Sequence, residues 1–183
     1  MTADFYALPP NLPIPEDDGA ADHLVGLELP DLVLDSSQGH VNIRDFDVLY
    51  VYPRTGRPGR ELPPGWDETP GARGCTPQSC AFRDAHAELT ALGVPVAGLS
   101  GQDLDDQLEL AERNEMPFPV IADPARTLGA RLRLPTFEIG GTTFYKRLTL
   151  LAERRRIVKV FYPVFPPDAN AGEVLAWLRA RAR

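Results

Sequence analysis

The stretch Val48-Leu49-Tyr50-Val51-Tyr52 is a continuous run of β-branched and aromatic residues. Such a run, without alternating polar positions, is typical of a strand buried on both faces in the middle of an α/β sheet. Residues 53–74, which follow it, are rich in Gly and Pro, and a loop of this length inside a domain is usually functional. The loop leads directly to Cys75, which draws attention to that residue.

A helix is predicted over roughly residues 76–92, because apolar residues recur there at helical spacing and Gly93 supplies a C-terminal stop. Cys75 therefore lies at a helix N-terminus. Unpaired backbone N–H groups and the positive end of the helix dipole favour a thiolate there, and the thiolate is the nucleophilic form. Pro77 suits the first helical turn, where its missing N–H is of little consequence.

Strands and helices alternate on both sides of this segment. Strands are expected near residues 27–34, 41–43, 94–99, 119–122, 136–139, 143–145, 147–152 and 157–161, and helices near 103–114, 124–132 and after 170. This alternation predicts parallel crossovers and an α/β fold with a central mixed β-sheet flanked by helices. Gly140-Gly141 predicts a two-residue hairpin turn. Asn170, with Glu173 three positions later, resembles a capping box at the start of the last helix.

Composition favours one folded domain with a short arm. The chain has 183 residues, of which 43% are hydrophobic and 25% charged. Residues 1–22 are Pro-rich and acidic and are expected to form an extended arm, with the folded domain at residues 23–183. The net charge of -7 argues against a nucleic-acid or anionic-membrane partner. No apolar stretch approaches the roughly 18 residues of a spanning helix, and no secretion signal is recognisable, so a cytoplasmic location is expected.

The two cysteines, Cys75 and Cys80, are too few for a disulfide scaffold and point to catalysis, redox sensing or metal binding. Zinc is disfavoured, because His86 would lie about 16 Å along the helix from Cys75 and cannot share a ligand set with it. A protein-disulfide oxidoreductase is also disfavoured, since that chemistry usually uses C-x-x-C spacing.

The segment Gly74-Cys75-Thr76, followed by Cys80 and Phe82-Arg83-Asp84, resembles the reactive region of Q-type peroxiredoxins, the bacterioferritin comigratory protein group. The resemblance covers about residues 24–180 and implies a thioredoxin-like fold. It also includes Leu29-Pro30-Asp31, Tyr50-Val51-Tyr52-Pro53, Phe118-Pro119-Val120, Asp123-Pro124 and Arg147-Leu148-Thr149-Leu150-Leu151.

The resemblance implies a role for each reactive residue. Cys75 would be the peroxidatic cysteine, Cys80 the resolving cysteine, and Arg147 the guanidinium that holds the thiolate and the peroxide oxygens. The family has a Thr or Ser three residues before the peroxidatic cysteine, where this chain has Ala72. Thr69, six residues before Cys75, is the candidate to supply that hydroxyl.

The implied activity is a thiol peroxidase that reduces hydrogen peroxide and organic hydroperoxides and is recycled by thioredoxin or a similar dithiol reductant. The resemblance also implies that this chemistry uses no metal or organic cofactor. A monomer or weak homodimer is expected. The alternative is a non-enzymatic redox sensor or chaperone, in which a Cys75–Cys80 disulfide switches a surface that binds a partner.

Overall fold

The main sheet has seven strands in the order β2-β1-β5-β4-β3-β8-β9, in a computed structural model that describes residues 4–181. Neighbouring strands are parallel for β3–β4 and β4–β5 and antiparallel elsewhere. This confirms the expected α/β class with a central mixed sheet. The strands are β1 (Val33–Ser36), β2 (Gly39–Asn42), β3 (Val48–Val51), β4 (Val96–Ser100), β5 (Val120–Ala122), β8 (Leu148–Glu153) and β9 (Arg156–Phe161).

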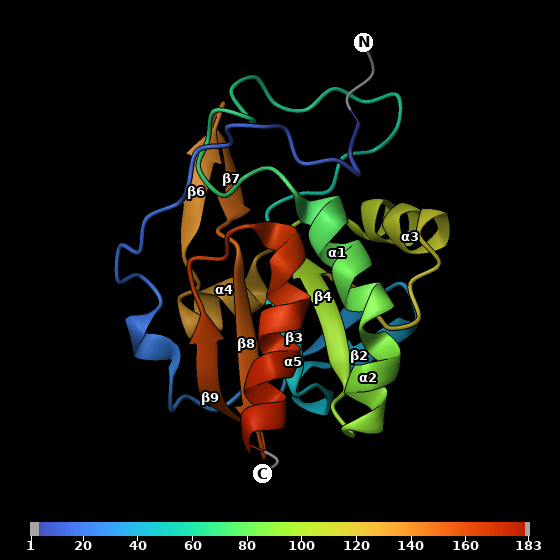
Figure 1. Ribbon diagram of the computed structural model, residues 1–183, viewed down its shortest axis with the longest axis vertical. Coiled ribbons are helices and arrows are strands. Elements are labelled where there is room, and N and C mark those ends of the chain that lie inside the picture. Colours follow the sequence, from blue (N-terminus) through green and yellow to red (C-terminus); the bar gives the residue numbers. More distant parts are fainter. Residues whose placement is uncertain (1–3, 182–183) are drawn as a thin grey trace.

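Helices lie on both faces of this sheet (Figure 1). The α-helices are α1 (Cys75–Asp84), α2 (His86–Ala91), α3 (Leu104–Arg113), α4 (Thr127–Leu132) and α5 (Asn170–Arg181), and the short 3-10 helices are η1 (Asp22–Leu24), η2 (Ile43–Asp45) and η3 (Pro167–Ala169). Together they bury apolar surface on both sides, which explains why the central strands are apolar throughout.

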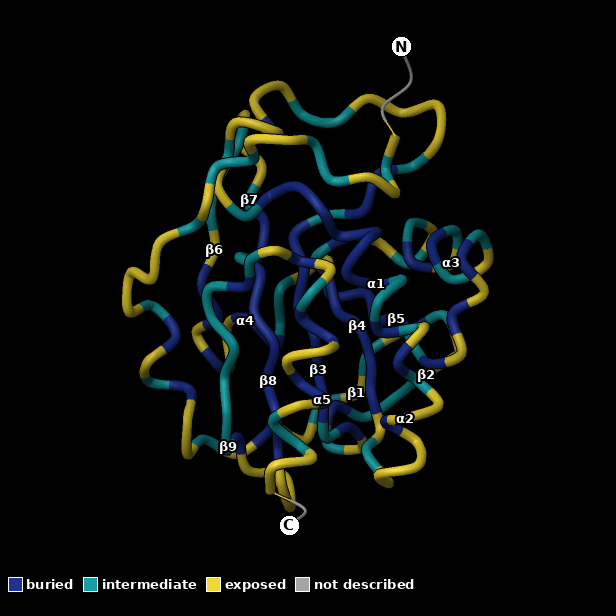
Figure 2. Tube along the Cα trace, viewed as in Figure 1, coloured by how far each residue is buried: buried dark blue, intermediate teal, exposed yellow. Residues whose placement is uncertain are grey.

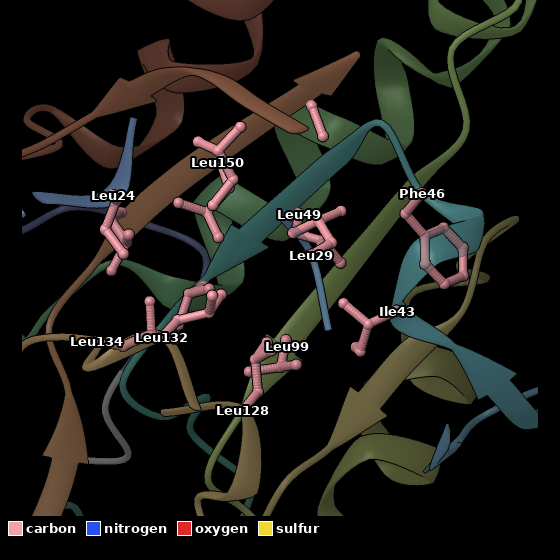
Figure 3. Packing of buried hydrophobic residues seen from close by; sticks show 14 of the residues in the cluster. Leu24, Leu29, Ile43, Phe46, Leu49, Leu99, Leu128, Leu132, Leu134 and Leu150 are labelled. Carbon is pink, nitrogen blue, oxygen red and sulfur yellow. The ribbon is translucent and has the colours of Figure 1, made fainter. Parts of the chain in front are cut away.

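Strand β3 divides the core into two clusters, because successive side chains of a strand point to opposite faces. Val48 and Tyr50 belong to the cluster formed with α1, α2, α3 and α5. Leu49 and Val51 belong to the cluster formed with η1, η2 and α4. Figure 3 shows this second cluster, in which leucines from distant parts of the chain, such as Leu24 and Leu150, pack together.

The single helix expected at 76–92 is wrong, because the chain forms α1 and α2 with a break at Ala85. Ala85 has φ -83° and ψ -5°, so its ψ departs from the regular helical value, and its carbonyl accepts from both the Glu88 and the Leu89 N–H, each at 3.1 Å. The helical spacing of the apolar residues continues across Ala85 although one ψ angle changes there. This spacing therefore predicted one continuous helix.

Strands β6 (Thr136–Ile139) and β7 (Thr142–Tyr145) form a separate two-stranded sheet, outside the main one. The predicted two-residue turn at Gly140-Gly141 is confirmed, and both glycines have positive φ, as a twisted hairpin turn requires. Trp66 packs on this hairpin, with its ring centroid 5.0 Å from that of Phe144. The hairpin thus anchors the long loop of residues 53–74 next to the start of α1.

The described part of the N-terminal arm contains no helix or strand before η1 and runs beside the 53–74 loop at one end of the molecule (Figure 1). That is also the end where β3 and β4 terminate and α1 begins. Figure 2 shows a buried first turn of α1 beneath a partly exposed arm. Among residues 4–181, no helix has both the length and the apolar character needed to cross a bilayer.

Candidate active site

Cys75 is the first residue of α1 and only 3% of its surface is exposed. Gly74 precedes it with φ +99°, a conformation that residues with side chains rarely adopt. A Cβ at Gly74 would also collide with Pro167. The first helical hydrogen bond runs from the Gln78 N–H to the Gly74 carbonyl, at 3.1 Å, so the N–H groups ahead of it have no partner within the helix.

Arg147 brings a buried guanidinium to this sulfur. Its Nη2 donates to Cys75 Sγ at 3.1 Å and its side chain is also nearly inaccessible, at 3% exposure. The same Nη2 lies within hydrogen-bond distance of three carbonyl oxygens of the preceding loop, those of Gly71, Ala72 and Arg73. The end of the loop is therefore wrapped around the guanidinium that faces the thiol.

The charge of Arg147 is not balanced by a carboxylate, since no acidic group among residues 4–181 forms an ion pair with it. A buried charge without a counter-charge is costly. A thiolate on Cys75 would supply the missing negative charge. The arrangement thus stabilises the form of the sulfur that attacks electrophiles.

A chain of buried polar residues holds the guanidinium in place. Gln78 Oε1 accepts from Arg147 Nη1 at 2.6 Å, and Gln78 Nε2 donates to Asn170 Oδ1 at 3.0 Å. Thr149 Oγ1 donates to the same Asn170 oxygen at 2.6 Å. The expected capping box at Asn170 is therefore wrong: the residue is the first of α5, and its side-chain oxygen binds Gln78 and Thr149 instead of capping the helix.

Sequence reasoning missed Gln78 and Asn170 as parts of the site. Gln78 follows Cys75 by three positions, and residues at this spacing share a face of a helix. That spacing was an available signal for Gln78. Asn170 carries no comparable signal, because it lies 92 positions from Gln78 and only the fold brings the two together.

Cys80 also lies on α1, and both cysteines are free. Its Sγ is half-buried and contacts Asn114 Oδ1 at 3.6 Å. Burial raises the pKa of the Cys80 thiol, and Asp84 adds to that rise, while Arg83 and Arg113 partly offset it. Cys80 is thus held as a neutral thiol, in surroundings that differ from those of Cys75.

Thr69 lies in the loop before α1 and lines a cavity together with Arg147. Its hydroxyl donates to the Gly65 carbonyl at 2.8 Å. Within the described residues, the polar contacts of Cys75 Sγ are with Arg147 and with the Ala72 carbonyl, the latter at 3.6 Å. The structure therefore brings Thr69 to Arg147 but places it in no hydrogen bond with the sulfur.

The second half of α1 is anchored by aromatic packing. Phe82 stacks on Tyr50 of β3, with ring centroids 4.3 Å apart and planes at 8°. Both side chains are fully buried. The helix is thus fixed to the sheet at Phe82, whereas its first turns, with both cysteines, depend on the polar contacts described above.

Comparison with known proteins identifies the group. Residues 68–161 match the model of the AhpC/TSA family. Peroxiredoxin Q of Triticum aestivum, a chloroplastic protein, is 31% identical over 129 residues, which are 70% of this chain and 52% of the relative. Peroxiredoxin Q of Oryza sativa subsp. japonica is 30% identical over 134 residues, 73% of this chain and 54% of the relative. The chain thus spans about half the length of these curated relatives.

Solved structures show the same fold. Peroxidoxin BcpB of Mycobacterium tuberculosis superimposes with a TM-score of 0.67 at 25% identity, over 85% of this chain and 96% of that one. Peroxiredoxin Q of Xanthomonas campestris gives a TM-score of 0.65 at 24% identity, over 86% and 98%. The thioredoxin-like fold implied by the sequence is therefore confirmed, and the chain belongs to the AhpC/TSA family as a Q-type peroxiredoxin.

Proposed function

We propose that the protein is a thiol peroxidase that reduces hydroperoxides, with Cys75 as its nucleophile. The observation that carries the proposal is the contact of 3.1 Å between Arg147 Nη2 and Cys75 Sγ, at a buried helix start. A cation and unpaired N–H groups at one sulfur stabilise negative charge both on the thiolate and on the oxygen that leaves.

In the first step the Cys75 thiolate attacks the terminal oxygen of the hydroperoxide. The S–O bond forms as the O–O bond breaks, and the leaving alkoxide or hydroxide takes up a proton to become an alcohol or water. Cys75 is oxidised to a sulfenic acid. Arg147 acts as a catalytic residue, because its Nη2 contacts the sulfur that reacts.

Cys80 then resolves the sulfenic acid. Its sulfur attacks Cys75, an S–S bond forms and water leaves, so that both cysteines end in a disulfide. A dithiol reductant restores the two thiols by exchange and leaves as a disulfide itself. We propose thioredoxin or a protein like it for this step, and a monomer or weak homodimer as the working unit.

The relatives support the reaction class. The bacterioferritin comigratory protein of Xanthomonas campestris, whose fold resembles that of this chain, has an alkyl peroxide reduction activity. Hydrogen peroxide and organic hydroperoxides are accordingly the substrates that we propose here.

Mass spectrometry of the intact protein tests the proposal. One equivalent of hydrogen peroxide should convert the reduced protein to a species lighter by two hydrogens, and a dithiol should reverse the change. Turnover with excess thioredoxin, thioredoxin reductase and NADPH separates an enzyme from the alternative, a redox sensor that is oxidised once. A protein whose mass stays unchanged after peroxide has neither function.

A further inference from the structure

A cavity of about 240 Å³ lies beside Arg147, and the N-terminal arm forms one of its walls. The arm contributes Pro15 and Glu16, and the remaining lining comes from three other parts of the chain. The first part is the end of the 53–74 loop, with Thr69, Pro70 and Gly71. The second is Phe137 of β6, together with Lys146 and Arg147. The third is the segment Tyr162, Pro163 and Val164. A smaller cavity next to it is also lined by Arg147, with Leu12 and Pro13 of the arm.

Asp18 fastens this wall to the body of the protein. Its carboxylate accepts from Lys146 Nζ at 2.6 Å and from the Tyr162 hydroxyl at 2.6 Å. Hydrogen bonds from Lys146 and Tyr162 hold the pKa of Asp18 far below its ordinary value. The carboxylate thus stays charged, and both of its partners are residues that line the cavity.

Arg147 links this cavity to the reacting sulfur, although Cys75 itself lines a separate, much smaller cavity. The guanidinium contacts Cys75 Sγ, while its Nε has no hydrogen-bond partner among the described residues although it is buried. Buried N–H groups are normally paired, so this donor lacks the acceptor that such groups require. A hydroperoxide whose oxygens meet the guanidinium from this side would have the rest of the molecule in the cavity.

The size and lining of the cavity limit which carbon tail a bound hydroperoxide can have. Clefts that hold drug-sized ligands measure roughly 300–1,000 Å³, so 240 Å³ suits a compact carbon tail and not a long acyl chain. Proline, phenylalanine and valine side chains supply an apolar lining. The arm closes the side along which a longer tail would otherwise extend.

The charge of the residues at the rim of the cavity is a second feature that selects among substrates. Lys146 is already paired with Asp18, and the charge of Arg147 is directed at the sulfur. The exposed carboxylate of Glu16 forms no ion pair among residues 4–181, so it adds net negative charge to the lining. Anionic substrates are therefore repelled at the rim, to the modest extent expected of an exposed charge.

We propose that residues 12–18 complete a substrate pocket, which selects neutral hydroperoxides with a compact apolar tail over long-chain and anionic ones. The inference rests on the proposed peroxidase function. Pro15 and Glu16 determine specificity from the rim and wall, and Asp18 is a positioning residue that keeps the wall closed.

Stopped-flow oxidation of the reduced full chain tests this with four probes: hydrogen peroxide, tert-butyl hydroperoxide, linoleic acid hydroperoxide and the methyl ester of the last. Hydrogen peroxide has no carbon tail and is the internal reference. The natural protein should oxidise at least roughly tenfold faster with tert-butyl hydroperoxide than with the methyl ester. Equal rates for these two would overturn the size limit, whereas no oxidation by any probe would overturn the proposed function itself.

Asp18→Ala opens the wall and should raise the rate for the methyl ester, relative to hydrogen peroxide, by about fivefold or more. Asp17→Ala is the matched control, because among residues 4–181 the carboxylate of Asp17 accepts one hydrogen bond, from the Gly19 backbone N–H. Pro15→Ala removes atoms from the wall of the cavity and leaves the Asp18 contacts in place. If Asp18→Ala does not fold, the rate of Pro15→Ala with the methyl ester, relative to hydrogen peroxide, tests the same point. If the rate with the methyl ester relative to hydrogen peroxide is the same in the natural protein and in both the Asp18 and Pro15 variants, the arm does not limit the size of the substrate.

Glu16→Gln separates charge from size. It should raise the rate for linoleic acid hydroperoxide by about threefold and leave the neutral methyl ester unaffected, because only the free acid carries a charge. An equal change for the acid and its ester would contradict electrostatic selection at the rim.

Discussion

The Nη2 atom of Arg147 lies 3.1 Å from the Sγ of Cys75, although the two residues are 72 positions apart. The position of each residue in the fold brings the two side chains together. Arg147 directly precedes β8, which lies antiparallel to β3, and Cys75 begins α1 at the end where β3 terminates. The sheet therefore sets the distance between a fixed cation and the nucleophilic sulfur.

The two cysteines should behave differently when replaced. Cys75→Ser should abolish peroxide reduction, because it removes the sulfur that contacts Arg147. Cys80→Ser should still consume about one equivalent of peroxide and then stop at the sulfenic acid or higher oxides. Peroxide consumption and intact mass measure both outcomes. Continued turnover by Cys75→Ser, or loss of the first oxidation in Cys80→Ser, would reverse the assignment.

Arg147→Leu should slow the oxidation of Cys75 by at least roughly 10²–10³-fold, the usual effect of removing one preorganised donor from a developing charge. Arg133→Leu is the control, since Arg133 is exposed at the end of α4. Stopped-flow measurement of the peroxide step compares the two variants. Similar losses in both would mean that Arg147 has no special part in the reaction.

Gln78→Glu should slow the peroxide step by roughly tenfold while the protein stays folded. The new carboxylate would lie where Gln78 Oε1 now accepts from Arg147 at 2.6 Å, and it would compete with the sulfur for the guanidinium charge. Gln38→Glu adds the same charge at an exposed position and is the control. An unchanged rate combined with a lowered thermal midpoint would indicate a structural role only.

Cys80 should react with iodoacetamide only at higher pH in the folded protein than in the unfolded chain. Burial raises the pKa of its thiol, so the folded state holds this proton more tightly. The corresponding stability is present below the ordinary thiol pKa and is lost as the pH rises towards the folded value. Alkylation rates of Cys75→Ser against pH, with and without urea, measure the difference. Coincident curves would contradict it.

Disulfide formation should unwind the start of α1. Residues five apart on a helix have Cα atoms roughly 8.7 Å apart, whereas a disulfide tolerates at most about 6.8 Å. Both cysteines are helical here, so residues 75–81 must leave the helix on oxidation. The stack of Phe82 on Tyr50 should stop the unwinding there.

Hydrogen exchange measures this change. Amides near Cys80 should lose protection in the oxidised protein, while residues 85–92 keep theirs. Protection that is identical in both states would exclude local unwinding. Since the sulfur of Cys80 contacts Asn114, Asn114→Ala should ease the transition, and faster disulfide formation in that variant would support the same mechanism.

The sequence by itself determined the class of fold and the position of Cys75 at the start of a helix. The apolar run from Val48 to Tyr52 predicts a buried central strand, because such a run has no face that could meet water. The position of Cys75 after a Gly-rich loop and before a helical pattern predicts a thiol at a helix start. These are local properties of the chain, since each depends on a few neighbouring residues.

Tertiary structure alone decided what surrounds that thiol. The Asn170 oxygen that holds Gln78, and the arm residue Asp18 that closes a cavity beside Arg147, make contacts across 92 and 128 or more positions. No local pattern encodes such pairings, because they arise only when the sheet, helices and arm have taken their places. The break at Ala85 is a subtler case: one ψ angle changed while the apolar spacing stayed the same. Sequence thus set where the thiol lies on its helix, and packing set the charge and the polar contacts around it.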